Sequence, residues 1–406
     1  MSSAVTAPTE TLTPAAAEQL SELESLRVAI VHHWFVTLGG GERVVSTIAS
    51  MFPKADLFTF FLHKQKLPST LRRHKITTSF LNKIPASRRV HRYLLPFYPL
   101  AVEWLDLSGY DLIITSDSGP MKGVITDRYA THICWCYSPM RYLWDAHSAY
   151  LGRMSRLTRT LFRPVSHYVR NWDYAAAQRV DRFIAISRYI ARRIHKYYRR
   201  DSTVIHCPVN TSQGFLTDKP EDYYLTVGRL VPYKRTDILI DACCKLGRKL
   251  VIIGDGPEMK RLRQRSGKNI EFLGEVSDAE LRNFYAHCRA FLFAADEDFG
   301  LVPLEAHSYG RPVIAFGKGG ALETVAGSFT PARHRENTKG PTVTGVFFSN
   351  RTADSLAEAI LAFESQEKIF VPEHIQLHAR QFDSSVFIDR MRSYIKAVIA
   401  DKTGTI

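Results

Sequence analysis

The sequence lacks the cysteine patterns that mark metal centres. Its six cysteines include no CxxC pair and no cluster with histidine, so a zinc site is not expected. Scattered thiols without such a framework are typical of a reducing compartment. The cysteine usage therefore favours a cytoplasmic location.

Long apolar runs are also absent. No stretch approaches the roughly 20 consecutive apolar residues that a membrane-spanning helix needs, which leaves a soluble or a peripheral protein. Residues 1–26 have neither the basic start nor the apolar centre of a signal peptide. They are rich in alanine, threonine, serine, proline and glutamate, and we expect them to form a disordered lead-in.

Acidic side chains are outnumbered by basic ones. The chain has 54 Lys and Arg against 40 Asp and Glu, a formal net charge of +14. This charge predicts an anionic partner, which could be nucleic acid, an anionic membrane surface or a phosphorylated substrate. No RNA-binding signature, helix-turn-helix pattern or strip of aromatic and basic residues stands out, so a nucleic-acid partner is not expected.

Two regions bear on a membrane partner. Residues 80–107 mix arginine and lysine with large apolar side chains and prolines. This composition fits a helix or loop lying in a membrane interface, and it fits core packing under a long connection equally well. Residues 140–200 are unusually rich in arginine, which indicates either a solvated face or a bias towards an anionic surface.

The chain, at 406 residues, is too long for one hydrophobic core, so two domains are expected. Strand and helix patterns alternate in both halves, which predicts α/β domains with doubly wound parallel sheets. Residues 206–222, with their prolines and glycine, indicate a linker. We therefore predict domains at 27–207 and 208–383. The predicted strands are 27–31, 55–60, 111–115, 132–137 and 182–186, then 224–227, 249–253, 270–273, 289–294 and 312–316.

The stretch 294–325 carries the strongest signal for chemistry. An acidic loop follows a predicted strand, and a short helix with Pro303 near its first turn is predicted to end at Gly310. Open α/β sheets bind ligands at this carboxyl edge. Glu297 is expected in the loop and Glu305 in the first helical turn, because the intervening glycine and proline prevent one continuous helix.

The opening of this short helix is a candidate anion site. The backbone N–H groups of Phe299, Gly300 and Leu301 are expected to lack helical partners and to carry partial positive charge. They could bind an anion or a ring of hydroxyls. The alternative is that the acidic residues only stabilise a helix N-terminus and that Glu305 is solvated.

Two further turns follow predicted first strands. Arg229 and Lys234 lie just past the strand at 224–227, where an arginine fork and a lysine point charge could clamp a diphosphate; ordinary surface charge is the alternative. Gly40 and Gly41 belong to a triple-glycine turn that would let the backbone approach a ligand. The alternative is a tight turn that binds no ligand.

Two short patterns mislead. Asp296 and Asp298 form a DxD pair, and Asp298 begins the letters DFG, as in protein kinases. The kinase glycine loop, VAIK and HRD are missing, and no further metal ligand stands at a useful spacing. We therefore expect neither a kinase nor a metal site.

Together the motifs resemble the family-4 retaining glycosyltransferases of the GT-B fold, in which two Rossmann-like domains face a central cleft. The resemblance covers nearly everything after Leu26 and is most specific in the C-terminal half. It is carried by GGGE at 39–42, VGRLVPYKR at 227–235, GDGPE at 254–258, FLGEVSD at 272–278, and EDFGLVPLEA at 297–306 with GKGGALETV after it. Residues 134–145 and 223–235 are similar to bacterial mannosyltransferase-like enzymes that build surface polysaccharides.

The resemblance implies a role for each matching residue on the donor side. Arg229 and Lys234 would hold the diphosphate of a sugar nucleotide, and Glu297 would face the donor sugar. Glu305 would bind the ribose hydroxyls, and the Val276 loop would touch the base. The backbone at 299–301 would bind sugar hydroxyls or phosphate, while Gly40 and Gly41 would let the N-terminal domain close over the diphosphate.

The acceptor side contains one departure from the family. Tyr137 stands where relatives usually carry a histidine near the donor sugar, and Arg141 follows it in the same segment. Sugar orientation or acceptor use is therefore expected to differ. The last helical segment, 384–406, would return to the N-terminal domain as in other GT-B enzymes.

The resemblance implies a metal-independent, retaining transfer of a hexose without a cofactor. The leading donor is GDP-mannose and the acceptor is a glycan or a polyprenyl-diphosphate-linked sugar, at the inner face of the cytoplasmic membrane. A UDP-sugar is the second donor candidate. A catalytically inactive subunit that scaffolds polysaccharide assembly is the alternative to an enzyme.

Overall fold

The computed structural model describes residues 23, 25–36, 39–85, 87, 91–152, 154–330 and 343–403. Most of the predicted lead-in, residues 1–26, lies outside these residues. The chain divides into two compact units, each made of several segments. Unit 1 contains residues 1–134, 154–182 and 392–406, and unit 2 contains residues 135–153 and 183–391.

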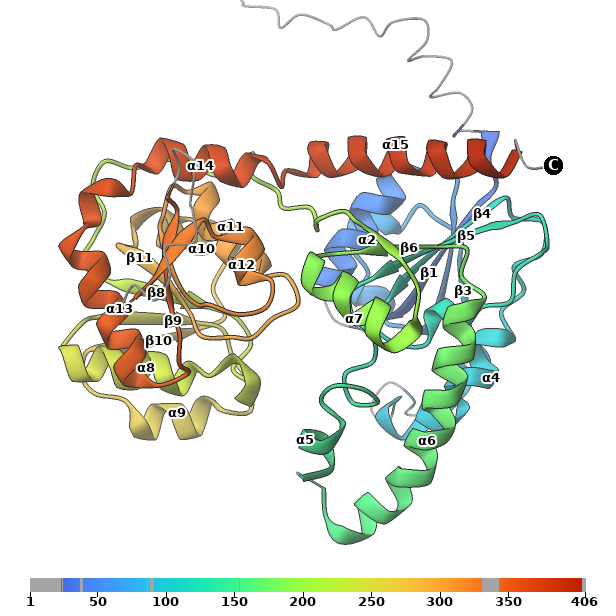
Figure 1. Cartoon of the computed structure of the whole chain (residues 1–406), viewed down its shortest axis with the longest axis horizontal. Helices are drawn as coiled ribbons and strands as arrows, with labels where there is room; N and C mark the ends of the chain where they lie inside the picture. Colours follow the sequence, from blue (N-terminus) through green and yellow to red (C-terminus); the bar gives the residue numbers. More distant parts are fainter. Residues whose placement is uncertain are drawn as a thin grey trace, which may run out of the picture. The chain divides into compact units, whose positions relative to one another are not determined.

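The first sheet has seven strands in the order β3-β2-β1-β4-β5-β6-β7 (Figure 1). Its described pairs, such as β1 with β2 and with β4, are parallel. The strands are β1 Val28–Phe35, β2 Asp56–Leu62, β3 Ile76–Thr78, β4 Leu112–Asp117, β5 Thr131–Cys136, β6 Arg182–Ala185 and β7 Ser202–Val204. The helices around them are α2 Gly40–Ser50, α4 Tyr98–Glu103, α5 His147–Gly152, α6 Arg156–Gln178 and α7 Arg188–Tyr198, with short 3₁₀ turns η1 Lys64–Lys66, η2 Ser69–Leu71, η3 Phe80–Lys83, η4 His91–Phe97 and η5 Met121–Gly123.

The first strand is longer than the sequence predicts. The predicted strand ends at residue 31, but β1 continues through two histidines and a tryptophan to Phe35. His32 is fully buried and its ring Nδ1 lies 3.1 Å from Ser116 Oγ of the neighbouring strand β4. A buried histidine that finds a hydroxyl partner can therefore extend a strand that hydropathy alone would end.

The second sheet also has seven strands, in the order β10-β9-β8-β11-β12-β14-β13, and its six neighbour pairs are parallel. The prediction of two doubly wound parallel sheets is confirmed. The strands are β8 Tyr224–Val227, β9 Leu250–Ile253, β10 Ile270–Gly274, β11 Ala290–Phe293, β12 Val313–Phe316, β13 Gly327–Thr330 and β14 Gly345–Phe348. The helical elements are η6 Pro232–Lys234, α8 Thr236–Leu246, α9 Met259–Arg265, α10 Asp278–His287, α11 Leu301–Ser308, α12 Ala321–Thr324, α13 Ala353–Ser365, η7 Glu367–Ile369, α14 Pro372–Arg380 and α15 Ser384–Thr403.

Apolar side chains cover both faces of the second sheet. Along β8, Tyr224 belongs to one core cluster and Leu225 to the other, as expected for alternating directions along a strand. The first cluster packs against α8 and α13, and the second against α10 and α11. Because both faces of the sheet are buried, a ligand can bind only at the edges where the strands begin or end.

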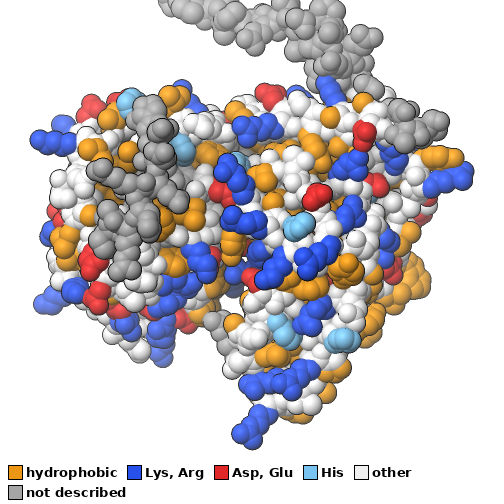
Figure 2. Space-filling view, viewed as in Figure 1, with side chains coloured by type: hydrophobic (Ala, Val, Ile, Leu, Met, Phe, Trp, Pro, Cys, Tyr) orange, Lys and Arg blue, Asp and Glu red, His pale blue; other side chains and the backbone are white. Residues whose placement is uncertain are grey.

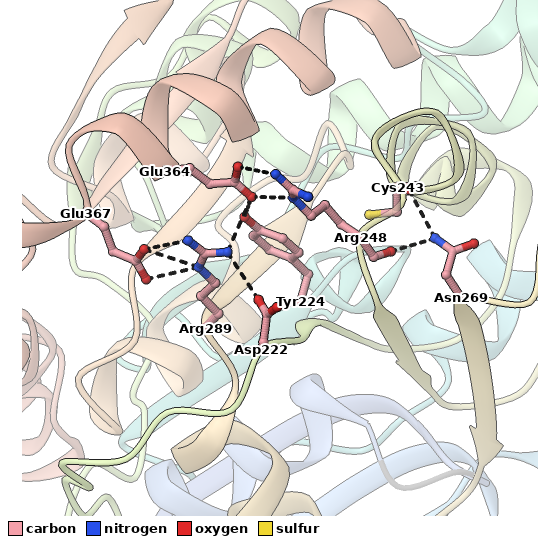
Figure 3. Close-up of polar contacts among 8 residues, drawn as sticks. All are labelled: Asp222, Tyr224, Cys243, Arg248, Asn269, Arg289, Glu364 and Glu367. Carbon is pink, nitrogen blue, oxygen red and sulfur yellow. Dashed lines mark hydrogen bonds and ion pairs between the residues drawn. The ribbon is translucent and has the colours of Figure 1, made fainter.

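Charged residues occupy the amino edge of this sheet (Figure 3). Arg248, which precedes β9, makes two 2.8 Å hydrogen bonds to Glu364 of α13. The Tyr224 hydroxyl donates to the same carboxylate at 2.8 Å, and Arg289, which precedes β11, donates to Glu367 at 2.7 Å. This network ties strand beginnings to α13 and η7 and leaves the carboxyl edge for the predicted site.

Among the described residues, no helix combines the length and the apolar character that a membrane crossing requires.

Candidate functional site

The turn after β8 is built by the GDGPE segment. The backbone N–H of Leu230 donates to Asp255 O at 2.9 Å, and that of Glu258 donates to Leu230 O at 3.1 Å. The GDGPE segment therefore holds the turn that contains Arg229 by direct backbone hydrogen bonds. The turn ends at Arg235, whose φ of 54° is in the left-handed region and whose guanidinium bonds Asp237.

A small hollow of about 20 Å³ lies at the carboxyl edge of this sheet. Arg229 and Lys234, the two cations predicted to clamp a diphosphate, both line it. Arg229 is exposed, whereas the Lys234 side chain is only 18% exposed. The rest of the lining is mostly backbone and apolar side chains from β8, β9, β11 and α8.

Lys234 forms an ion pair with Glu297. Burial acts to lower the pKa of Lys234, but the carboxylate of Glu297 outweighs it, so the pKa of Lys234 is raised. Sequence reasoning gave the two residues separate partners, a diphosphate and a sugar. The structure brings them together, 63 positions apart in the chain, as each other's partner.

The acidic loop is held by glycines. Gly300 has a φ of +94° at the start of α11, a conformation that a side chain would strain. Gly320 approaches the loop so closely that a Cβ there would lie 2.2 Å from Phe299 Cα, and its N–H donates to Glu297 O at 2.8 Å. The GKGG loop thus fixes the backbone of the acidic loop.

The short helix α11 begins at Leu301, immediately after this glycine turn, as the sequence predicts. Glu305 is its fifth residue, so it lies in the second turn and not in the first turn that the sequence predicts. The Phe299 side chain is buried and stacks on His206, with ring centroids 5.5 Å apart. Only the backbone of Phe299 is therefore left for a role at the site.

Glu305 projects from α11 onto a tyrosine. The Tyr285 hydroxyl of α10 donates to Glu305 Oε2 at 2.9 Å. Burial, reinforced by the Glu305 charge, raises the pKa of Tyr285 well above its ordinary value, so the hydroxyl stays a donor. Val276 packs against the same apolar cluster as Tyr285. Val276, predicted to touch the base, and Tyr285, the partner of Glu305, therefore pack in the same apolar cluster.

Asp298 lies at the centre of a charge cluster that sequence reasoning missed. Arg193 Nη1 of α7 bonds Asp298 Oδ1 at 2.9 Å, and its Nη2 bonds Asp145 Oδ1 at 2.5 Å. Arg141 Nη1 lies 3.9 Å from the same Asp298 oxygen. Burial raises the pKa of Asp298, and the two guanidinium groups oppose that shift. The letters DFG thus mark an ion-pair centre next to Glu297.

The N-terminus of α7 also contacts the backbone of the acidic loop. Ser187 Oγ donates to Asp298 O at 2.7 Å. Glu323 of α12 accepts from the backbone N–H groups of Arg188 and Tyr189 at 2.9 and 3.0 Å. Burial acts to raise the pKa of Glu323, but hydrogen bonds from His206 and these amides outweigh it and lower the pKa.

The remaining predicted residues are spread over both units. Tyr137 and Arg141 belong to unit 2, and Arg141 reaches the Asp298 cluster. Gly40 and Gly41 belong to unit 1 and form the first residues of α2, and not the turn that the sequence predicts. Their part in donor binding stays a prediction.

The DxD carboxylates have basic partners. Asp296 Oδ2 lies 3.1 Å from Lys318 Nζ, and Asp298 is held by arginines. Within the described ranges, no group of three or more His, Cys, Asp or Glu side chains is placed to hold a metal ion.

Two family models match the chain in succession. "Glycosyltransferase Family 4" matches residues 38–213, and "Glycosyl transferases group 1" matches residues 210–379. The chain belongs to the family-4 glycosyltransferases with the GT-B fold.

Relatives with curated names are similar over part of their length. The chain is 33% identical to an uncharacterised glycosyltransferase of Methanocaldococcus jannaschii over 36% of this chain and 42% of that protein. It is 29% identical to a GDP-mannose-dependent monoacylated alpha-(1-6)-phosphatidylinositol monomannoside mannosyltransferase of Corynebacterium glutamicum over 45% of this chain and 52% of that one. The chain thus spans about half, or less, of the length of these relatives.

Solved structures share the whole fold at low identity. Anabaena HepE in complex with UDP is 17% identical with a TM-score of 0.66, covering 92% of this chain and 100% of that one. Sucrose-phosphate synthase from Thermosynechococcus elongatus has the same identity, TM-score and coverage. At this identity the likeness supports the GT-B fold alone.

Proposed function

We propose that the protein is a retaining hexosyltransferase that moves mannose from GDP-mannose to a lipid-linked or oligosaccharide acceptor in surface polysaccharide biosynthesis. The observation that carries this proposal is that Arg229 and Lys234 line one hollow and that Lys234 is ion-paired with Glu297. A sugar nucleotide has a diphosphate and a sugar at adjacent positions, and this cluster offers cations and a carboxylate at adjacent positions.

The chemistry follows from charge development. Breaking the anomeric C–O bond leaves negative charge on the departing nucleoside diphosphate and positive charge on the sugar. Arg229 and Lys234 stabilise the leaving group, and the N–H groups at the start of α11 add backbone donors. Each such preorganised donor contributes on the order of 3 kcal/mol to lowering a barrier. The residues present supply this stabilisation without a metal ion.

Donor binding requires an exchange of partners. Lys234 is paired with Glu297, so a bound diphosphate takes the lysine and releases the carboxylate towards the sugar. In the GT-B site Glu297 then orients the sugar hydroxyls. Glu305, held by Tyr285, binds the ribose.

The donor assignment rests on the relatives. Two of them, from Corynebacterium glutamicum and Mycobacterium tuberculosis, are named as GDP-mannose-dependent mannosyltransferases. A UDP-sugar is the second candidate, because Anabaena HepE was solved with UDP and with UDP-glucose. The names of the mannosyltransferases also contain a phosphatidylinositol acceptor, which supports a lipid-linked acceptor and a peripheral position at the inner face of the cytoplasmic membrane.

The test is calorimetric titration of the full chain with GDP, UDP and ADP, without metal and with a chelator present. We expect GDP to bind more tightly than the other two, and Glu305→Ala to lose about 1–3 kcal/mol of binding free energy because a part-buried hydrogen-bond partner is removed. Glu373→Ala is the matched control, since Glu373 is also a helical glutamate of unit 2 but is exposed.

Each result has a distinct meaning. Tighter binding of UDP would replace mannose by a UDP-sugar. Binding of none of the three nucleotides would favour the scaffold subunit. A transfer assay with GDP-mannose, read by nuclear magnetic resonance of the new anomeric centre, then tests retention of configuration.

A further inference from the structure

The first half of α6 exposes a row of apolar side chains. Leu157, Leu161 and Tyr168 are 72%, 64% and 52% exposed, and Pro164 between them is also exposed. These four residues, here called the α6 stripe, recur every three or four positions. They therefore share one side of the helix.

A different side of α6 packs into unit 1. Val169, Asp173 and Ala176 are fully buried, and helical geometry places them away from the stripe. The stripe is thus separate from the side of α6 that packs into unit 1. An exposed apolar row of this kind marks a surface for a partner.

Basic residues form a second row on α6. Arg156, Arg163 and Arg170 are spaced by seven residues and lie on a third side of the helix, about as far around it from the stripe as the buried side is. Between Asp145 and Asp173 the sequence contains five arginines and no acidic residue. This single sign of charge complements an anionic surface.

The neighbouring helix exposes apolar side chains as well. Three large apolar side chains are exposed along α4 at helical spacing. They are Phe97, which precedes the helix, Leu100 within it and Trp104, which follows it, and they are 53%, 50% and 70% exposed. Glu103 joins the two helices, accepting from the Trp172 indole of α6 at 2.8 Å. Figure 2 shows hydrophobic and basic side chains together on the part of the surface where Figure 1 draws α4 and α6.

We propose that the α6 stripe and its arginine row dock unit 1 onto the surface of an anionic lipid bilayer. The stripe enters the boundary between headgroups and acyl chains, and the arginines bind lipid phosphates. A continuous charge of one sign fits a lipid surface better than a protein, whose interfaces mix both signs with few charges at the core. This proposal goes beyond the transfer reaction, and its test uses no sugar nucleotide.

The experiment is co-sedimentation of the full chain with vesicles of phosphatidylglycerol and phosphatidylcholine, compared with phosphatidylcholine alone. The wild type is expected to prefer the anionic vesicles and to release as salt increases. L157E/L161E is expected to bind at least about tenfold more weakly, because two apolar contacts become two repelled charges. The matched control L361E/L377E changes two leucines of α13 and α14 that are 48% and 60% exposed, and it should bind like the wild type.

A second pair of variants separates charge from apolar contact. R156Q/R163Q is expected to lose most of the preference for anionic vesicles, whereas R72Q/R73Q, which removes two exposed charges elsewhere in unit 1, should keep it. All four positions of the two α6 variants are exposed, so melting temperatures are expected to stay near that of the wild type. Equal binding by L157E/L161E and the wild type would overturn the proposal, as would equal binding of the wild type to both kinds of vesicle.

Discussion

Each unit contains a cluster of buried charge that joins the loop after a strand to a distant helix, and the two clusters differ in exposure. In unit 1, Lys122 contacts Asp117 at the end of β4 and Asp173 of α6, with side chains 0–1% exposed. In unit 2, Arg193 contacts Asp298 and Asp145, with side chains 8–24% exposed.

The difference separates a structural cluster from one next to a site. Lys122 also donates to Gly119 O at 2.9 Å, and Asp117 accepts two backbone N–H groups. The first cluster therefore stabilises the loop at residues 117–122 that contains Lys122 and Asp117. The second cluster reaches water and adjoins Glu297. Charge that is sealed off acts on stability, whereas charge beside a binding site acts on how that site is positioned.

The largest expected effect is on Lys122. Lys122→Met would leave the carboxylates of Asp117 and Asp173 buried without a cation, which costs about 3–5 kcal/mol of unfolding free energy. Chemical denaturation measures it, and the double variant with Asp173→Asn should recover part of the loss. A Lys122→Met protein as stable as the wild type would show that the first cluster is not structural.

The next effect concerns pH. Burial lowers the pKa of His32 to about 3 and that of His132 to about 3, both in unit 1, and burial also lowers the pKa of His307 in unit 2 to about 3. These histidines are neutral when folded and protonate on unfolding, so stability is lost as the pH falls below about 6.5. Each residue costs about 2 kcal/mol at pH 5.

Burial also lowers the pKa of His378 in unit 2, so both units should lose protection as the pH falls. Hydrogen exchange measured by mass spectrometry between pH 7 and pH 5 reports each unit separately. His307→Gln should flatten the pH dependence of unit 2 and leave that of unit 1 unchanged. An equal change in both units would contradict the assignment of this histidine.

The smallest expected effect is on Arg193, which acts on Glu297 only through Asp298. Arg193→Lys keeps the positive charge, but a lysine has one amino group in place of the two guanidinium nitrogens that contact Asp298 and Asp145. We expect kcat for sugar transfer to fall about tenfold while nucleotide affinity stays within about twofold, because positioning changes and the nucleotide contacts do not. Arg192→Lys, at the exposed neighbour, is the control. Equal losses in both variants would show that the effect is not one of positioning.

The sequence predicts the fold because local patterns determine it. Each predicted strand of the second sheet lies within one residue of the observed one. Buried parallel strands appear as short apolar runs, and glycine and proline mark their ends. Strand β1 is longer than predicted because hydropathy does not register the partner that His32 finds in Ser116.

The site is predictable only in part. Arg229 and Lys234 both follow strand β8 and both line the hollow, as predicted. Their positions are predictable because residues just after a strand must lie near the edge where that strand ends. The contacts from Lys234 to Glu297 and from Arg193 to Asp298 join residues far apart in sequence, so no local pattern contains them. One signal was present: Ile190, Ile194 and Tyr198 mark the buried face of α7, and Arg193 falls on that face within a run of arginines that otherwise indicates solvated charge.

The ion pair between Lys234 and Glu297 has a consequence for association kinetics. Because Glu297 already neutralises Lys234, the exposed Arg229 is left to project positive potential from the hollow, and the whole chain adds a net charge of +14. This long-range attraction of an anionic nucleotide sugar is screened over about 10 Å at 0.1 M salt. The donor's on-rate should therefore fall as ionic strength rises, whereas contacts with the largely buried Lys234 are screened less, so the pocket's selectivity resides in how long the donor stays rather than in how fast it arrives.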